Sequence, residues 1–194
     1  MNYKKKINRH YNNLLSKYGY SKSGIGWKSD KLTMRFSKFS NHINFENCTI
    51  LDYGAGLGHF HEFLNQKKVK FKQYYYYDIN DSFKEYFINN FSSKKTQILT
   101  SYPSKKFDVI IMNGVHNYNY SSNNKIIRQD IKNLFNISKK CFGFSFLNND
   151  VDYKNKNLFY HDENKLINYV KKFSKKIIID KTFGRFETFI LMYK

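Results

Sequence analysis

Two carboxylates and a glycine-rich turn have the residue types and spacing of a nucleoside-binding site. The stretch TILDYGAGLGHF (49–60) is an apolar strand that ends in Asp52 and continues through Gly54, Gly56 and Gly58. Gly54 and Gly56 allow a tight turn whose backbone can touch a ligand, and Gly58 lets the next helix start close against the strand. At the strand's carboxyl end, Asp52 can accept from a ligand's ammonium group or hold the turn itself.

The spacing of these glycines argues against a pyrophosphate ligand. One residue separates each pair, whereas the dinucleotide fingerprint has two residues before its third glycine. Asp78 ends the next strand, 20 residues past Gly58 (78 less 58), where a carboxylate can accept from both ribose hydroxyls. Ile79 follows as an apolar contact for adenine. An Asp after a strand is more often a helix cap, and Asn80 or Asp81 could fill that role instead.

The fourth apolar run, FDVIIMNGVH (107–116), delivers further polar residues to the same edge. Ligands of open α/β sheets bind at the carboxyl ends of the strands, so Asn113 and Gly114 are expected to line the ligand. His116 and Asn117 would then face a second reactant. A lone histidine is more often structural, yet His116 is the best-placed general base in the sequence.

Short apolar runs alternate with amphipathic stretches from Cys48 onward, which predicts strands and helices of a mostly parallel sheet. Strands are expected near Thr49–Tyr53, Gln73–Ile79, Thr96–Leu99, Phe107–Asn113, Phe142–Leu147, Lys176–Asp180 and Glu187–Tyr193. Helices are expected near His59–Gln66, Ser82–Phe91, Lys125–Ser138 and Glu163–Phe173.

The linker between the last two strands, 181–186, is too short for a crossover helix, so these strands should form an antiparallel hairpin. The expected fold class is α/β: a Rossmann-like, seven-stranded, mostly parallel sheet with a terminal antiparallel hairpin and helices on both faces. Residues 1–45 form a helical prefix, with helices near Tyr3–Tyr18 and Ser29–His42, and residues 46–194 form the main part of one structural domain.

The formal charge of +19 has two readings. Only four of the 34 basic residues are arginine, as expected from the codon usage of an AT-rich genome, whereas nucleic-acid readers favour the arginine fork. A field of this size would still attract anions, so a functional basic surface and an acidic substrate stay open. The two cysteines lack metal-ligand spacing, and no export signal or membrane-length apolar run is visible, which favours a cytoplasmic protein without a metal site.

On these motifs the chain resembles the class I S-adenosylmethionine-dependent methyltransferases, and within them a group of small bacterial methyltransferase-domain proteins. The narrower likeness rests on Tyr18-Gly19, Gly26-Trp27 and Arg35-Phe36, on VDYK (151–154) with LFY (158–160), and on the ending FILMYK (189–194). It implies S-adenosylmethionine as cofactor, with Asn113 and Gly114 along its methionine portion.

The resemblance also implies that residues 1–45 fold over the cofactor, with Tyr11, Trp27 and Arg35 in contact. An aromatic face favours the sulfonium cation, and an arginine could pair with the cofactor's carboxylate. Trp27 and Tyr11 could equally pack the prefix on the sheet. The implied cofactor-binding set is Tyr11, Trp27, Arg35, Asp52, Gly54, Ala55, Gly56, Gly58, Asp78, Ile79, Thr100, Ser101, Asn113 and Gly114. Thr100 and Ser101 are in this set because the segment after the third strand has no acid for the adenine amino group.

Three functions follow from the resemblance. The first is methyl transfer to an oxygen or nitrogen of a small molecule, such as a sugar or another metabolite, with His116 as base and Asn117, Tyr153, Tyr160 and His161 as acceptor-binding residues. The second is a nucleic-acid methyltransferase that uses the lysines, although the fourth strand lacks an Asn/Asp-Pro-Pro-Tyr-like motif. The third is a cofactor-binding protein without methyl transfer.

Overall fold

The computed structural model describes residues 3–27, 32–184 and 186–194. Its strands are β1 (Thr49–Tyr53), β2 (Gln73–Tyr77), β3 (Thr96–Ile98), β4 (Phe107–Asn113), β5 (Ser138–Leu147), β6 (Lys176–Asp180) and β7 (Glu187–Tyr193). Its helices are α1 (Tyr3–Tyr18), the 3-10 turn η1 (Ser23–Ile25), α2 (Leu32–Ser40), α3 (His59–Gln66), α4 (Asp81–Phe91), α5 (Asn123–Ile137) and α6 (Glu163–Val170).

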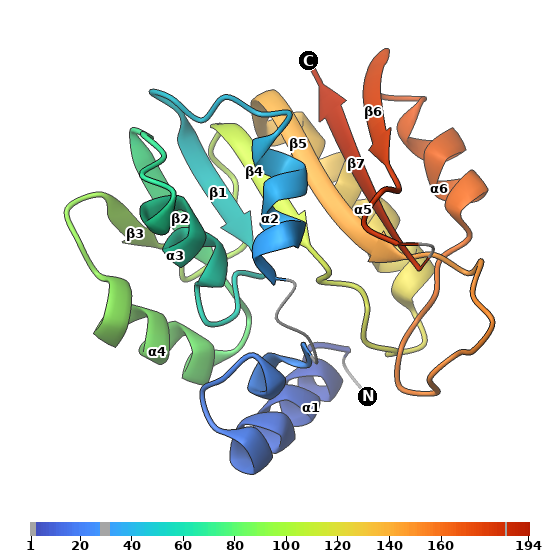
Figure 1. Ribbon diagram of the computed structural model, residues 1–194, viewed down its shortest axis with the longest axis horizontal. Helices are drawn as coiled ribbons and strands as arrows, with labels where there is room; N and C mark the ends of the chain where they lie inside the picture. The colour runs from blue at the N-terminus through green and yellow to red at the C-terminus, as the bar shows by residue number, and fades with distance from the viewer. Residues whose placement is uncertain (1–2, 28–31, 185) are drawn as a thin grey trace.

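The strands form one twisted sheet in the order β3-β2-β1-β4-β5-β7-β6 (Figure 1). All neighbours are parallel except β7, which pairs antiparallel with both β5 and β6. The predicted fold class, with its terminal hairpin, is therefore confirmed. The parallel strands bring the ends of β1, β2 and β4 to one edge of the sheet, the carboxyl edge.

Several element boundaries differ from the predicted ones. β5 begins at Ser138 rather than Phe142, because Ser138 already pairs with Phe107 of β4. β2 ends at Tyr77, which leaves Asp78 and Ile79 in the turn beyond the strand. α6 stops at Val170 instead of Phe173. The predicted start of the second prefix helix, at Ser29, lies outside the described residues.

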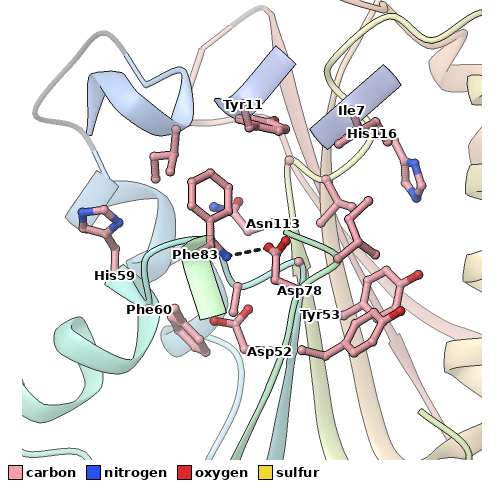
Figure 2. Close-up of a pocket in the computed structure, with 18 of the residues that line it drawn as sticks. Ile7, Tyr11, Asp52, Tyr53, His59, Phe60, Asp78, Phe83, Asn113 and His116 are labelled. Atoms are coloured by element: carbon pink, nitrogen blue, oxygen red, sulfur yellow. Dashed lines mark hydrogen bonds between the residues drawn. The ribbon is translucent and has the colours of Figure 1, made fainter. Parts of the chain in front are cut away.

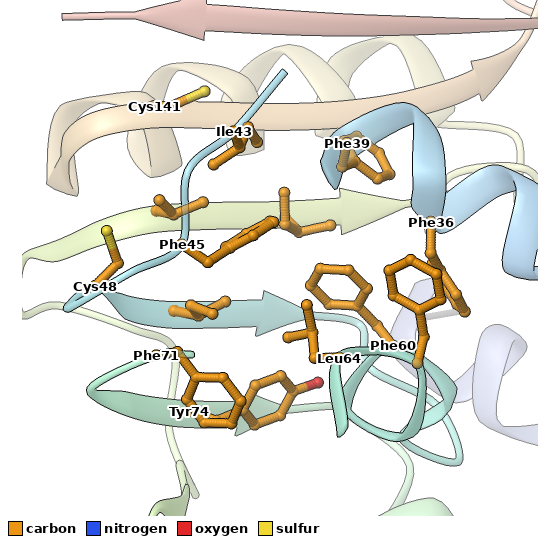
Figure 3. Packing of buried hydrophobic residues seen from close by; sticks show 14 of the residues in the cluster. Phe36, Phe39, Ile43, Phe45, Cys48, Phe60, Leu64, Phe71, Tyr74 and Cys141 are labelled. Carbon is orange, nitrogen blue, oxygen red and sulfur yellow. The ribbon is translucent and has the colours of Figure 1, made fainter. Parts of the chain in front are cut away.

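Two hydrophobic cores hold the sheet between its helices. One core joins α2, α3 and α4 to one face, with Phe36, Phe39, Phe60 and Tyr74 closely packed (Figure 3). The other joins α5 and α6 to the opposite face. Each fully buried aromatic side chain contributes roughly 1.5–3 kcal/mol, so the buried rings of α2 anchor this helix to the sheet.

The connection between β3 and β4 is shorter than the other crossovers and forms no helix across residues 99–106. Lys105 instead extends over the ring of Tyr75, with Nζ 3.7 Å from the ring centroid. Tyr102 of the same connection donates to Asp130 on α5 at 3.1 Å. Aromatic side chains thus cover the part of the sheet that a crossover helix would otherwise cover.

Helix α1 lies across the carboxyl edge of the sheet (Figure 1). Asn8 Nδ2 donates to the carbonyl oxygen of Ile79 at 3.2 Å, and Asn80 Nδ2 donates to Asn12 Oδ1 at 2.8 Å. These two hydrogen bonds tie α1 to the turn after β2. None of the described helices is long and apolar enough to cross a membrane.

Candidate functional site

Two adjoining cavities open at the carboxyl edge, and we call them the inner and the outer cavity. The inner cavity is bounded by the ends of β1, β2 and β4 and covered by α1 (Figure 2). Its lining is Tyr3, Lys4, Ile7, Tyr11, Ile25, Trp27, Leu32, Phe36, Asp52, Tyr53, Gly54, Ala55, Gly56, His59, Phe60, Tyr77, Asp78, Ile79, Phe83, Asn113, Gly114, Val115, His116 and Asp130.

The glycine turn forms the floor of the inner cavity. Gly54 has φ +74° and Gly56 φ +55°, a region that side chains other than glycine rarely adopt. A Cβ on Gly54 would lie 2.4 Å from Val115 Cγ2, so this position excludes any side chain. The amides of Gly54 and Ala55 both donate to the carbonyl of Tyr77, at 2.8 and 3.1 Å, which fixes the turn to β2.

Gly58 has a packing role rather than a place in the cavity lining. A Cβ there would lie 2.4 Å from the Phe87 ring, so α3 and α4 could not approach each other as they do. The inclusion of Gly58 among the cofactor-binding residues is therefore corrected. Its close packing was expected, but the neighbour is α4 rather than the preceding strand.

Asp78 points into the inner cavity from the turn after β2 (Figure 2). Its Oδ2 accepts from the Gly56 amide at 2.9 Å, and its Oδ1 accepts from the Asn80 amide at 2.9 Å. Burial raises the pKa of Asp78 to about 6, although these hydrogen bonds act in the opposite direction. The helix-cap role belongs to Asn80, whose side chain accepts from the Phe83 amide at 3.2 Å.

Asp52 lies deeper in the same cavity and is only 3% exposed. The Tyr74 hydroxyl donates to it, and burial together with nearby Asp78 raises its pKa to about 7. Tyr76 lies two residues after Tyr74, on the same face of β2, and its hydroxyl donates to the carbonyl of Gly56 at 2.8 Å. Sequence reasoning missed both tyrosines, although their i, i+2 spacing in the run QYYYY places them on one face of the strand.

The end of β4 supplies the opposite wall. Ser145 Oγ donates to Asn113 Oδ1 at 2.8 Å, which fixes the orientation of the Asn113 amide. Gly114, at φ +67°, leaves space for Trp27, since a Cβ would lie 2.9 Å from its ring. Trp27 therefore packs against the backbone of the β4 turn and contributes to both cavities.

His116 lines the inner cavity but has both ring nitrogens engaged. Nε2 lies 3.1 Å from Asp130 Oδ2, and Nδ1 contacts the Tyr120 hydroxyl. Because a carboxylate only accepts, Nε2 donates to Asp130, and Nδ1 is occupied by the Tyr120 hydroxyl. His116 is 4% exposed and is absent from the outer lining, so its expected position facing a second reactant is corrected.

The outer cavity, of about 940 Å³, lies between α1, the segment after η1 and residues 147–160. It meets the inner cavity at Tyr11, Ile25, Trp27 and Gly114, which line both. The remaining lining residues are His10, Leu14, Gly26, Arg35, Asn117, Tyr118, Leu147, Asp150, Val151, Asp152, Tyr153, Asn155, Asn157, Leu158, Tyr160 and Phe186. Asn117, Tyr153 and Tyr160 thus lie where an acceptor was expected.

Four other predicted residues lie elsewhere. His161 is fully buried, with its ring against Phe146 and Phe159, and lines neither cavity. Thr100 and Ser101 are exposed and line neither cavity. Arg35 is paired with Glu187 and stacks between Trp27 and Phe183, with its Cζ 4.1 and 4.5 Å from the ring centroids. It lines the outer cavity, so its predicted pairing with a cofactor carboxylate is corrected.

The charges around the cavities contrast with the +19 of the whole chain. Among described residues, the inner lining has the carboxylates of Asp52, Asp78 and Asp130 against Lys4, and the outer lining has Asp150 and Asp152 against Arg35. A low-dielectric pocket with this balance favours cations over anions.

The side chains and backbone that line the inner cavity have the chemistry to bind a nucleoside that carries a sulfonium and an amino acid. The Gly54–Gly56 backbone forms a cradle that a Cβ would fill, and the two carboxylates suit ribose hydroxyls and an ammonium group. At the other side of the cavity His59 Nδ1 is buried without a hydrogen-bond partner among the described residues. Such an atom can donate to a ligand's carboxylate. Figure 2 shows His59 and His116 on opposite sides of the two aspartates.

Solved structures share the fold across nearly the whole chain. A SAM-dependent methyltransferase of Leishmania major matches with a TM-score of 0.72 at 14% identity, over 99% of this chain and 83% of that one. Magnesium protoporphyrin IX methyltransferase of Synechocystis PCC 6803 with bound SAH matches with a TM-score of 0.70 at 10% identity, over 100% of both chains. Phosphoethanolamine N-methyltransferase 1 of Haemonchus contortus matches at 0.73 and 11%, over 98% of this chain and 48% of that one.

The sheet order, glycine turn and paired carboxylates define a Rossmann-like methyltransferase fold of class I. Residues 26–121 match the family model described as a methyltransferase domain. No curated protein matches the chain by sequence. Residues 26–121 are thus similar to a methyltransferase domain, and the matched structures with bound SAM or SAH make S-adenosylmethionine the cofactor to test for the inner cavity.

Proposed function

We propose that the protein transfers the methyl group of S-adenosylmethionine to a nitrogen or oxygen of a small, uncharged or cationic acceptor held in the outer cavity. The observation that carries this proposal is the junction of the two cavities at Tyr11, Ile25, Trp27 and Gly114. A methyl group that passes this junction moves from a donor in the inner cavity to an acceptor in the outer cavity, and methyl transfer requires the two to meet in this way.

The inner cavity supports a cofactor pose that can be tested residue by residue. Asp78 would accept from the ribose hydroxyls, Asp52 would face the ammonium group, and Ile79 with Tyr77 would contact adenine. Asn113, Gly114 and His59 would surround the methionine portion. The faces of Tyr11 and Trp27 would flank the sulfonium, which an aromatic ring stabilises by its negative face.

The size of the outer cavity favours a small molecule. Its volume of about 940 Å³ falls within the range of metabolite sites, and α1 with residues 150–160 forms its walls. The nucleic-acid alternative loses support here, because none of the described residues that line this cavity is a lysine. An anionic acceptor is also disfavoured, since Arg35 is already paired with Glu187.

The chain's contribution to the reaction is alignment, exclusion of water and removal of a proton. When bound, S-adenosylmethionine supplies an electrophilic methyl group on sulfur. Trp27 and Gly114 would hold the acceptor's lone pair in line with it, and α1 would exclude water. For a protonated acceptor we assign the base to His10, which stacks on Tyr118 with centroids 3.8 Å apart and lines the outer cavity. Burial lowers the pKa of His10, which keeps the ring neutral near pH 7.

An isotope-labelled methyl assay with fractionated metabolites tests this function. We expect label in a low-molecular-mass fraction, and lower transfer by at least about tenfold in Val151→Trp, whose indole would obstruct part of the outer cavity. Calorimetric affinity for S-adenosylmethionine should stay unchanged in that variant. The matched control is Asp78→Ala, which should weaken cofactor affinity while leaving the outer cavity open.

Two results would contradict the proposal. Label incorporated into RNA or DNA in preference to small molecules would return the acceptor to the nucleic-acid class. Tight cofactor binding with no label in any fraction would favour a cofactor-binding protein without methyl transfer.

A further inference from the structure

The edge of the sheet opposite the cavities carries 13 of the 25 exposed lysines among the described residues. The parallel strands β1 to β5 all begin at this amino edge. The register places Lys176 beside Tyr193, and Tyr193 beside Cys141, so the start of β6 and the end of β7 lie there too. In Figure 1 this edge lies at the top, away from α1.

Exposed lysines flank the strand ends along this whole edge, and we call them the amino-edge lysines. They are Lys67, Lys68, Lys70, Lys72, Lys94, Lys95, Lys105, Lys106, Lys139, Lys140, Lys175, Lys176 and Lys194. The acids in the neighbouring described turns are Glu46 and Asp108. Asp108 is largely occupied, because the Thr49 amide and hydroxyl both donate to it at 2.8 and 2.7 Å.

Two simpler causes do not account for this arrangement. Codon usage explains why the cations are lysine, but it does not explain why thirteen of them lie along one edge while, among the described residues, Lys4 is the one lysine in the two cavity linings. Helices α3 to α6 end at this edge, and a helix dipole favours cations near its carboxyl end. That effect falls off within the last helical turn. Lys70, Lys72, Lys139 and Lys176 lie beyond it, in connections or strands.

The dimensions of the edge suit an extended polyanion. Seven strands give six spacings of about 4.8 Å, or roughly 29 Å of edge. One nucleic-acid strand carries a phosphate about every 3.4 Å in a duplex, so roughly eight phosphates span this length. Lysines flank six of the seven strands, which gives a row of cations of matching length.

We propose that the amino edge binds the sugar–phosphate backbone of a nucleic acid without reading its sequence. Lysine is a point charge suited to phosphate, whereas base readout favours the arginine fork. Of the exposed large apolar side chains among the described residues, only Tyr102 lies in one of these connections, and its hydroxyl donates to Asp130, which disfavours insertion into a membrane. The edge is about 20 Å from the cavities, the length of a strand, so the nucleic acid anchors the enzyme and is not its methyl acceptor.

Fluorescence anisotropy with a labelled 20-nucleotide single strand, as RNA and as DNA, tests this surface on the full chain. The edge variant replaces Lys70, Lys95, Lys106, Lys139 and Lys175 by Gln. The control variant makes the same change at Lys5, Lys17, Lys125, Lys132 and Lys165, which are exposed on α1, α5 and α6. Both variants lose five charges, so a diffuse field would weaken binding equally.

We expect the edge variant to lose at least about thirtyfold in affinity at 0.1 M salt, and the control variant less than about threefold. The slope of log K against log salt should fall by about three in the edge variant alone, at about 0.7 per phosphate contact. Equal losses in both variants, or no binding by the parent protein, would overturn the proposal. So would binding to phosphatidylserine vesicles, but to neither single strand, since that would assign the edge to a membrane surface.

Discussion

The two edges of the sheet carry opposite charges in opposite environments. At the carboxyl edge, Asp52, Asp78 and Glu187 are enclosed, and burial raises the pKa of each of them to between about 6 and 7. At the amino edge, lysines stand in water on short turns. The contrast teaches that the net charge of +19 describes the surface of this protein and not its binding site. A ligand's charge is better inferred from the few enclosed groups.

The largest expected effect is on stability at the carboxyl edge. Arg35→Ala leaves the fully buried Glu187 without its partner, and the free energy of unfolding should fall by roughly 3–5 kcal/mol. Urea unfolding measures it. The loss should be greater near pH 8 than near pH 6, because the pKa of Glu187 is about 7 and protonation removes the isolated charge. A loss below about 1 kcal/mol would mean that this ion pair contributes no more to stability than an exposed one.

Asp78→Ala should weaken S-adenosylmethionine binding at least tenfold, on the order of 1.4 kcal/mol, because two ribose hydroxyls lose their acceptor. Calorimetry measures the change. Asp78→Asn is the control for the turn, since its carbonyl oxygen still accepts from the Gly56 or Asn80 amide. Unchanged affinity in Asp78→Ala would refute the ribose assignment.

Cofactor affinity should also depend on pH. With a pKa of about 7 for Asp52 and about 6 for Asp78, both acids are ionised near pH 8 and increasingly protonated near pH 6. A cationic ligand prefers the ionised form, so affinity should fall by up to about tenfold over that interval. The stability of the folded protein without ligand changes with pH in the opposite direction. A raised pKa in an acid stabilises it at low pH, and that stability is lost as pH rises through 6 to 7. An affinity that is flat with pH in the parent protein, or an equal slope in Asp52→Asn, would contradict this account.

The smallest effect is expected at the amino edge. Lys139→Gln removes a partly exposed cation 3.9 Å from Asp108, and the free energy of unfolding should change by less than about 1 kcal/mol. The same urea experiment that tests Arg35→Ala measures it. A change as large as that of Arg35→Ala would mean that burial does not distinguish the two edges.

Local patterns in the sequence were enough to predict the sheet, the hairpin and the positions of Asp52, Asp78 and Asn113, because strand ends and turn glycines are set by neighbouring residues. They were insufficient for Arg35 and His161, whose partners lie far away in sequence: Glu187 is 152 positions from Arg35. Thr100 and Ser101 were misplaced because the segment itself does not show which way a connection without a helix runs after β3. His10 gave no signal, since only the docking of α1 brings it to the outer cavity.

The two amide hydrogen bonds that tie α1 to the turn after β2 link helix docking to cofactor occupancy. Asn8 and Asn12 bond to Ile79 and Asn80, the residues that directly follow Asp78. A ligand held by Asp78 steadies that turn, so it also steadies the chain's first helix. Bound cofactor should therefore slow cleavage of residues 3–18 by trypsin, whose lysine and arginine targets there otherwise depend on the helix undocking. The amino-terminal helix then reports on occupancy of the inner cavity, through its resistance to proteolysis, without any change at the acceptor.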